Sequence, residues 1–445
     1  MNLARHSISA TKPVHIIDAR YDPECRIFTA ATPAGFAVYN TWPLTLVRKR
    51  ELVGGTLASV TPLHATNLLF LVGGGRSPLY PPNKVILWDD ALGREVAELE
   101  FRERVRGIAC RRGLLAVSLR RRVVVFEVGK TVKRFGEWDT CDNPRGLLAM
   151  ASAPHSTLLA IAGRQTGHVQ LIHLPPCPLP QPRDPPPSAP PSKPPPPPSK
   201  HPVSMIVAHK TALTTISIPQ SGRILATTSS QGTLIRIWDA LSGKLIKELR
   251  RGTDKAEIYG VAFRPDEQDL CVWSDKGTVH VFSLSIAGAS NRHSSFSNLT
   301  PFIPLPRYFE SEWSYAQYRI PVQSSHISIT STKSNNGDQH EEERCVVGWV
   351  DASSPDENSS RGQVPEYQLI ALTFTGGWYR LSLPPIRGSG KDGSSLLKAA
   401  ASLTSKPRST SGSHKSDKGK EKEEKQSRDC ILQEYRKFGR WDGWG

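Results

Sequence analysis

The chain lacks long apolar runs, paired cysteines and helical periodicity, and each absence excludes a class of protein. The longest apolar candidate, at residues 68–72, is far shorter than the roughly 18 residues that span a bilayer. The first 20 residues contain no apolar core of a secretory signal, so we expect a reducing, cytoplasmic compartment. The seven cysteines are scattered without a Cys-x-x-Cys pair, so we predict no disulfide framework, no metal site and no cofactor.

The composition is strongly basic. The 57 lysines and arginines outnumber the 41 acidic residues, which gives a formal charge of +16. Summed charge of this size favours anionic partners such as nucleic acid, an acidic membrane or a phosphorylated ligand. It does not choose among them.

Three segments differ in composition from the rest of the chain. Proline makes up 16 of the 28 residues from 175 to 202, which predicts an extended, inserted loop. Ser, Lys, Glu and Gly dominate from residue 387 onward, so we predict a disordered basic tail over 387–445. Polar residues predict long loops over 331–363, around a strand at 345–350.

The remaining sequence consists of short β-branched and aromatic runs between turn residues. One pattern, a polar or glycine turn followed by an alternating apolar strand, occurs seven times. The repeats start 37 to 49 residues apart once residues 175–202, 285–312 and 330–363 are left out. The seven strands lie at 36–39, 85–89, 123–126, 169–172, 234–239, 279–282 and 378–381.

A period of about 40 to 45 residues with Trp-Asp at a strand end is typical of a WD-type propeller blade of four strands. Trp-Asp ends the strands at 85–89 and 234–239. We therefore predict an all-β fold, a seven-bladed β-propeller over residues 12–386, with its clearest blade at 209–239. A β-sandwich with added loops is the alternative architecture.

Two neighbouring repeats share a Ser-x-x-Gly-Thr turn. The turn at 229–233 precedes the turn at 274–278 by 45 residues. Small hydroxyls and exposed backbone amides can surround an anion, so these turns are candidate anion sites. The alternative is a plain hairpin turn between two strands of a blade.

Arg250 and Arg251 lie between these two turns. Successive side chains of an extended segment point to opposite sides, so adjacent arginines can serve two different pockets. The guanidinium group binds phosphate oxygens through two parallel hydrogen bonds and stays charged. Alone, the pair would also suit a solvated basic turn, but His209, Arg236 and His280 lie close to the turns in the repeat and favour two phosphate sites.

These motifs resemble the PROPPIN family, seven-bladed propellers of autophagy that bind phosphatidylinositol 3-phosphate and phosphatidylinositol 3,5-bisphosphate; animal members are called WIPI proteins. The family motif usually begins with Phe, and Leu249 in that place is characteristic of the Leu-Arg-Arg-Gly fungal branch, the SVP1-like proteins. The resemblance covers the blades from about residue 12 to 386. It is carried by residues 249–252, 274–282, 72–75 with 81–85 and 87–90, and 167–171.

The resemblance implies two lipid pockets and no catalytic residues. Trp273 stands where a small serine is common, at the expected rim of the second pocket. The first lipid-binding site maps onto His209, Thr227, Ser229, Gly232, Thr233, Arg236 and Arg250, and the second onto Arg251, Ser274, Thr278 and His280.

Residues 285–312 form a third expected element. Apolar residues in a loop expose an apolar patch unless they are covered or inserted, and the equivalent family loop dips into the bilayer. Packing on the propeller rim is the alternative. The residues expected to insert are Leu299, Phe302, Ile303, Leu305, Tyr308 and Phe309.

The reference pKa of histidine, about 6.5, predicts tighter liposome binding at mildly acid pH. The resemblance further implies a partner, the large autophagic lipid-transfer protein, contacted through the second and third blades. It places the protein as a monomer at vacuolar and endosomal membranes, cytoplasmic vesicles and preautophagosomal sites.

Other features leave alternatives open. Residues 102–134 contain 11 basic and two acidic residues, which could suit nucleic acid, but no interleaved aromatic residues provide a stacking platform. We expect instead a solvated blade edge and no nucleic-acid partner. The proline run is a spacer or a ligand for SH3 or WW domains. A generic WD scaffold is the alternative function; we expect no enzyme, because no catalytic motif is present.

Overall fold

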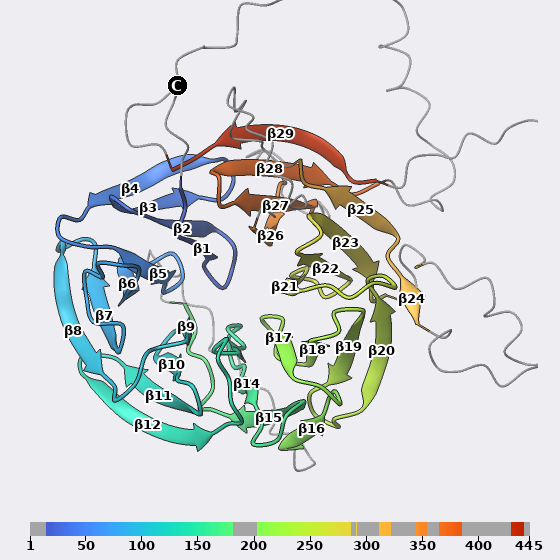
Figure 1. Cartoon of the computed structure of the whole chain (residues 1–445), viewed down its shortest axis with the longest axis horizontal. Coiled ribbons are helices and arrows are strands. Elements are labelled where there is room, and N and C mark those ends of the chain that lie inside the picture. Colours follow the sequence, from blue (N-terminus) through green and yellow to red (C-terminus); the bar gives the residue numbers. More distant parts are fainter. Residues whose placement is uncertain are drawn as a thin grey trace, which may run out of the picture.

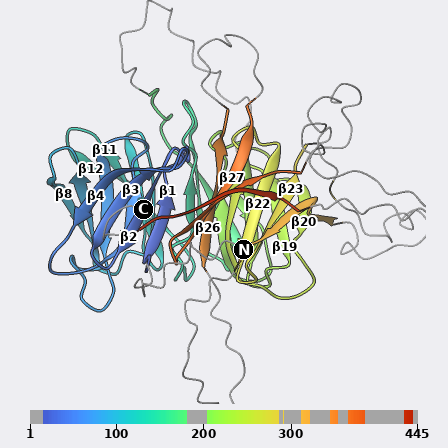
Figure 2. The same cartoon turned by 90° about the horizontal axis from the view of Figure 1, so that it is seen from above.

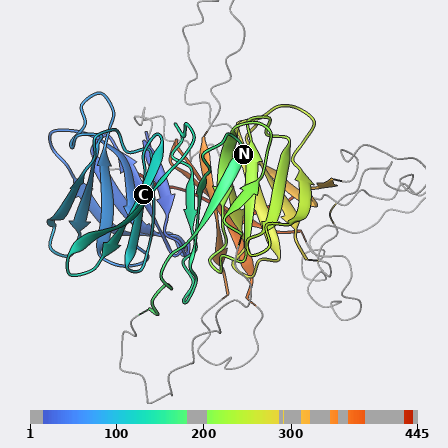
Figure 3. The ribbon, with the colours of Figure 1, turned by 90° about the horizontal axis from the view of Figure 1, so that it is seen from below.

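The strands form seven antiparallel sheets arranged around a central axis (Figure 1). The computed structural model describes residues 15–180, 203–285, 291, 311–321, 344–353, 365–384 and 429–439. In edge-on views the sheets stand side by side across a disc (Figures 2 and 3). The prediction of an all-β, seven-bladed propeller is confirmed.

The strands of each blade follow one another along the chain, from the axis outward. Blade 1 contains β1 (Asp18–Tyr21), β2 (Ile27–Thr32), β3 (Gly35–Asn40) and β4 (Thr45–Glu51); blade 2 contains β5 (Leu57–Pro62), β6 (Leu68–Gly73), β7 (Lys84–Asp89) and β8 (Arg94–Glu100). Blade 3 contains β9 (Gly107–Arg111), β10 (Leu114–Ser118), β11 (Arg122–Val128) and β12 (Val132–Asp139); blade 4 contains β13 (Leu148–Met150), β14 (Leu158–Ala162), β15 (His168–His173) and β16 (Met205–Val207). Blade 5 contains β17 (Leu213–Ser217), β18 (Ile224–Ser229), β19 (Leu234–Asp239) and β20 (Leu245–Arg250); blade 6 contains β21 (Ile258–Phe263), β22 (Asp269–Ser274), β23 (Thr278–Ser283) and β25 (Ala316–Arg319). Blade 7 contains β26 (Cys345–Asp351), β27 (Tyr367–Thr373), β28 (Gly377–Ser382) and β29 (Ile431–Lys437), and β24 (Glu312–Trp313) runs parallel to β20 as a fifth strand of blade 5.

All seven strands that the repeat predicted are the third strands of their blades, namely β3, β7, β11, β15, β19, β23 and β28. The third strands have buried apolar residues at their centres and partly exposed ends, whereas second strands such as β2 and β22 are buried throughout.

Each pair of neighbouring blades shares one hydrophobic cluster, which gives seven clusters around the ring. The strands alternate between these clusters because successive side chains leave opposite faces of a sheet. In blade 5, Leu225 packs toward blade 4, whereas Ile235 packs toward blade 6, and neither is exposed. Full burial of such a side chain stabilises the fold by about 1.5–3 kcal/mol.

Blades 7 and 1 close the ring by packing and side-chain contacts. The hydroxyl of Tyr21 donates to the carbonyl of Ile370 at 2.8 Å, and the amide of Ile16 donates to the carbonyl of Phe374 at 2.9 Å. Phe438 packs edge-on against Phe28 with ring centres 5.2 Å apart. The residue that follows β29 therefore belongs to the core of the ring.

The predicted tail over 387–445 was wrong for residues 431–437. These residues form β29, which pairs with β28 and completes blade 7, so the propeller extends beyond residue 386. The strand is mostly exposed and follows a charged sequence, and its partner lies about 50 residues earlier. Average composition therefore hid it.

The three predicted insertions interrupt blades 4, 6 and 7. Residues 175–202 connect β15 to β16, and their first part packs on the propeller, with Cys177 buried. The guanidinium of Arg111, also fully buried, donates to the carbonyls of Ser156 and Pro175. The strand predicted at 345–350 within residues 331–363 is β26. Across the described part of the chain, no helix could cross a membrane.

Candidate functional site

Every blade is closed by the same backbone hydrogen bond. A residue just after the outer strand donates its amide to the carbonyl that directly precedes the third strand, at 2.8–3.0 Å. We call the donor the closing residue. The closing residues are Leu52, Phe101, Thr140, His209, Arg251, Ile320 and Phe438.

The closing residue of one blade meets the third residue of the next blade's third strand. Four such pairs share an apolar cluster, for example Leu52 with Ile86 and Ile320 with Tyr379. The junction of blades 3 and 4 has the uncharged polar residues Thr140 and Gln170. Only two junctions carry basic residues: His209 with Arg236 between blades 4 and 5 (junction 4/5), and Arg251 with His280 between blades 5 and 6 (junction 5/6). The two junctions thus use the same two residue types in exchanged places.

At junction 4/5, His209 enters a hydrogen-bonded chain. Its Nε2 lies 2.9 Å from the hydroxyl of Thr227, which also accepts from the indole of Trp238 at 2.9 Å. Opposite Thr227 in the sheet, Arg236 donates to Glu248 at 2.9 Å and to the carbonyl of Ala208 at 2.7 Å. The side chain of Arg236 is 29% exposed, so it is held in place and still reachable by an anion.

The two Ser-x-x-Gly-Thr turns are equivalent, as their spacing predicted. The amide of Gly232 donates to the carbonyl of Ser229 at 2.8 Å, and that of Gly277 donates to Ser274 at 3.1 Å. Both glycines adopt left-handed φ values, 64° and 66°. The β22–β23 hairpin of blade 6 is one residue shorter than the β18–β19 hairpin of blade 5. Its register shows this, since Arg236 lies opposite Thr227 whereas His280 lies opposite Val272. Arg236 and His280 are therefore structural counterparts although they lie 44 residues apart.

Arg250 faces blade 4. It lies opposite Leu234 in the β19–β20 register, on the same face as Arg236. Its Nε donates to the hydroxyl of Ser311 at 2.8 Å, and its guanidinium lies 5.8 Å from the ring centre of Trp313. Only 1% of Arg250 is exposed, so the residues around it cover it almost completely.

Arg251 faces blade 6. Its Nε donates to the carbonyl of Gly232 at 3.2 Å, and a second nitrogen donates to the carbonyl of Asp254. Burial lowers the pKa of Arg251, and the carboxylates of Asp275 and Asp254 counteract this effect. The structure brings Arg251 close to His280 of the second predicted set. Arg251 also bonds to the carbonyls of Gly232 and Thr233, which were predicted for the first set.

Both histidines stay neutral at physiological pH. Burial lowers the pKa of His209 to about 4, with a further contribution from Arg236. Burial likewise lowers the pKa of His280 to about 4, together with the charge of Arg251. The reference pKa therefore does not apply, and the expectation of tighter binding at mildly acid pH loses its basis.

Comparisons with known proteins show the family of this chain. The PROPPIN family pattern matches residues 198–303. This range contains Arg236 and Arg251, the junction residues of blade 5, and both Ser-x-x-Gly-Thr turns. The chain is 31% identical over 353 residues to "SVP1-like protein 2" of Pichia angusta, across 78% of this chain and 88% of that protein. The chain belongs to the PROPPIN family.

Two solved PROPPIN structures show the same fold. Hsv2 of Kluyveromyces lactis superimposes with a TM-score of 0.59 at 17% identity, covering 95% of this chain and 99% of that one. The structure titled "Complex of KlAtg21 with coiled-coil of AgAtg16" gives a TM-score of 0.58 at 14% identity, covering 96% and 99%. PROPPINs are phosphoinositide-binding propellers of autophagy and are typically non-catalytic.

Trp273 of this PROPPIN faces away from His280. Its side chain packs in the cluster between blades 6 and 7, whereas His280 faces blade 5. The indole lies against Gly260, where an added Cβ would come within 2.1 Å of the ring. Trp273 therefore does not lie at the expected rim, because neighbouring residues of β22 face opposite blades.

The residues expected to insert into the bilayer, 299–309, lie outside the described part of this PROPPIN. The described ends of that segment are anchored on blades 5 and 6. Asn291 exchanges hydrogen bonds with the backbone of Ser283 and donates to Glu312, which also pairs with Lys247 at 3.3 Å.

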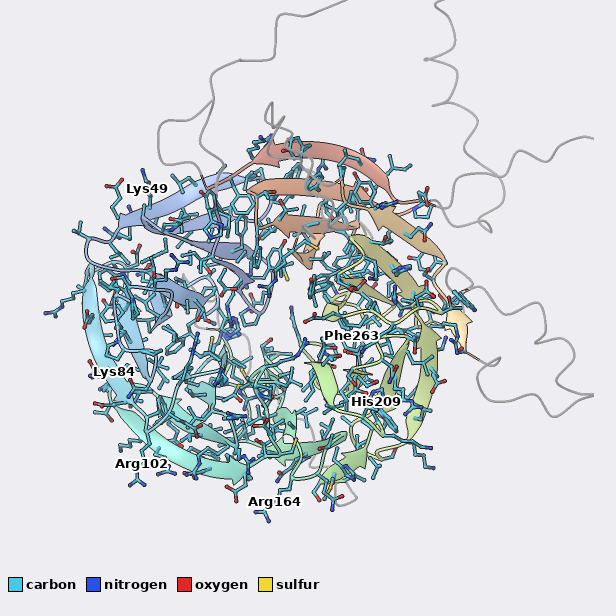
Figure 4. All side chains as sticks on the ribbon, in the orientation of Figure 1. Lys49, Lys84, Arg102, Arg164, His209 and Phe263 are labelled. Atoms are coloured by element: carbon cyan, nitrogen blue, oxygen red, sulfur yellow. The ribbon has the colours of Figure 1, made fainter. Side chains whose placement is uncertain are left out.

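Much of the basic stretch at 102–134 is paired with acids. Arg120 contacts Asp142, and Arg122 and Arg134 both contact Glu137. Arg102 lies on the periphery of the disc with Arg164 (Figure 4). This arrangement fits a solvated blade edge.

Sequence reasoning missed the groups that hold the arginines. Glu248 could have been found, because counting back along the β19–β20 hairpin places it opposite Arg236. Ser311 had no such signal, because it lies about 60 residues after Arg250 and reaches it only through β24.

Proposed function

We propose that this PROPPIN is a phosphoinositide-dependent peripheral membrane adaptor in autophagy, which recognises phosphatidylinositol 3-phosphate and phosphatidylinositol 3,5-bisphosphate at junctions 4/5 and 5/6. The observation that carries the proposal is the reciprocal pair of histidine and arginine, found at two of the seven otherwise equivalent junctions.

The residues at each junction suit a phosphate monoester. Arginine supplies permanent charge and paired donors, and the hydroxyls and amides of the Ser-x-x-Gly-Thr turn supply further hydrogen bonds. A neutral histidine donates through one ring nitrogen. Each junction thus provides one inositol phosphate site, with Arg236 and Arg250 at the first and Arg251 at the second.

Membrane anchoring combines these sites with the apolar residues of the segment 285–312. Two headgroup contacts and one inserted loop act as linked binding events, so their joint affinity exceeds that of each site alone. Phe302→Asp is expected to abolish liposome binding while junction contacts and thermal stability remain unchanged.

The proposed locations are vacuolar and endosomal membranes, cytoplasmic vesicles and preautophagosomal sites, with the large autophagic lipid-transfer protein as partner through blades 2 and 3. One structural neighbour binds a coiled coil, as its title states, which supports protein partners within the family.

Liposome flotation tests the lipid function. Arg250→Thr combined with Arg251→Thr should remove binding to vesicles containing phosphatidylinositol 3-phosphate. Lys437→Thr is a matched control, because Lys437 ends the outer strand of blade 7 as Arg250 ends that of blade 5. It removes one positive charge from a blade that borders neither junction.

The control also separates the alternative, a generic WD scaffold that associates with membranes through charge alone. In that case flotation depends on total charge and is equal with and without the phosphoinositide. Full binding of the double variant, or equal losses per charge in both variants, would contradict the proposal.

A further inference from the structure

Three hairpin turns that carry acidic or basic side chains lie close together where blades 1, 2 and 3 adjoin. Asp22 and Glu24 lie in the turn between β1 and β2, and His64 lies in the turn between β5 and β6. One potential ligand atom from each of these residues lies within 4.8 Å of the other two. Arg112, from the turn between β9 and β10, donates to Glu24 at 2.8 Å.

His64 is the unusual member of this group. It is 2% exposed, and neither ring nitrogen makes a hydrogen bond. Its Nδ1 points toward Glu24, with 3.3 Å between Nδ1 and Oε1. A buried polar group without a partner is costly and needs an explanation such as an ion.

The two carboxylates are already oriented. Asp22 accepts the amides of Ile27 at 2.9 Å and of Glu24 at 3.2 Å, which fixes its position and leaves further lone pairs on both oxygens. Glu24 is positioned by Arg112 and Arg26, and the side chain of Arg26 is 62% exposed, so it can withdraw into solvent.

A neutral imidazole offers the lone pair of one ring nitrogen to a metal, while its other nitrogen carries the proton.

We propose that Asp22, Glu24 and His64 bind one divalent transition-metal ion of the zinc class. One nitrogen and two oxygen ligands with an open fourth position are an accepted zinc environment. Tetrahedral ligand atoms at about 2.0–2.1 Å from the metal lie about 3.4 Å from one another. Side-chain rotations that bring the ligand atoms about 1.4 Å closer together therefore complete the site. Bound metal joins two turns that lie 40 residues apart and so links blade 1 to blade 2. This proposal replaces our expectation of no metal site, because that expectation was based only on the spacing of residues along the chain.

Calorimetric titration of the full chain with Zn²⁺ tests the site. Wild type should bind one equivalent more than His64→Ala, and Glu24→Gln should weaken that equivalent at least tenfold. His155→Ala is the matched control, because His155 lies in the corresponding turn of blade 4 with a similar left-handed backbone, φ 64° against 51° for His64. It should bind as wild type does, which accounts for zinc held by other histidines or by thiols.

Thermal unfolding gives a second readout if His64→Ala folds poorly. Zn²⁺ should raise the Tm of wild type and His155→Ala, and EDTA should reverse the rise. Glu24→Gln, which keeps the size of the side chain, should lose that rise. Equal stoichiometry and equal Tm shifts in wild type and Glu24→Gln would overturn the proposal.

Discussion

Junctions 4/5 and 5/6 carry the same residue types in exchanged places, but the surrounding protein holds them differently. At junction 4/5 the basic residues also serve the fold: His209 belongs to the chain with Thr227 and Trp238, and Arg236 is paired with Glu248. At junction 5/6 the counterpart of Thr227 is Val272, and Arg251 bonds to backbone carbonyls. His280 contacts the hydroxyl of Ser314 at 3.2 Å. Variants at the first junction therefore disrupt a chain of three side chains and an ion pair, whereas variants at the second remove fewer side-chain contacts.

The largest predicted difference concerns the two turn glycines. A Cβ at Gly232 would lie 1.7 Å from the carbonyl oxygen of Ala256, whereas at Gly277 the nearest atom is 3.9 Å away. Gly232→Ala should cost about 4 kcal/mol or more, since backbone must move. Gly277→Ala should cost about 1–2 kcal/mol, the strain of a left-handed alanine. Urea unfolding measures both, and equal losses would show that the two turns are held alike.

The next largest effect is on lipid affinity. Arg251→Thr removes a charge-assisted contact worth about 1.5–3 kcal/mol, so affinity for vesicles with phosphatidylinositol 3-phosphate should fall about 10- to 100-fold. Surface plasmon resonance on captured vesicles measures the change. Lys437→Thr in blade 7 should change affinity less than about threefold, as expected for one exposed charge. Equal losses would remove the special role of junction 5/6.

Thr227→Val is expected to act on stability. It leaves His209 and the indole of Trp238 without their shared partner, at a cost of about 1–3 kcal/mol. Thr278→Val at the second junction removes only a long contact, 3.5 Å to the carbonyl of Lys276, and should stay within about 0.5 kcal/mol. Thermal unfolding of both variants measures the two losses of stability. A larger loss in Thr278→Val than in Thr227→Val would contradict the structural role of Thr227.

The smallest predicted effect is that of pH on binding. The pKa values of His209 and His280 are about 4, so neither histidine takes up a proton between pH 7.5 and 6 in the free protein. The second pKa of a phosphate monoester is about 6, so the ligand loses charge over the same interval. Affinity should stay constant or fall slightly toward pH 6. Clearly tighter binding at pH 6 would mean that a bound phosphate raises a histidine pKa into this range.

The regular parts of the propeller could be predicted from sequence, and its irregular parts could not. The third strands each follow a polar or glycine turn and carry buried apolar residues, and this combination recurs at a steady period that gives seven blades. The exposed strand β29 carries no such signal, and its place depends on β28 far earlier in the chain.

The site shows the same division. Alternation along β20 was enough to predict that Arg250 and Arg251 diverge toward different blades. The burial of Arg250 and the lowered pKa values of the histidines depend on packing between blades, which spacing along one strand does not contain. The cluster of Asp22, Glu24 and His64 depends on the same packing.

The central claim is that two separate junctions each bind one inositol phosphate. Calorimetry with a soluble headgroup, inositol 1,3-bisphosphate, tests it most directly on wild type, on Arg236→Thr and on Arg251→Thr, with folding checked by circular dichroism. We predict two sites in wild type and one remaining site in each folded variant. One site in wild type, or loss of all binding in Arg251→Thr alone, would contradict the account.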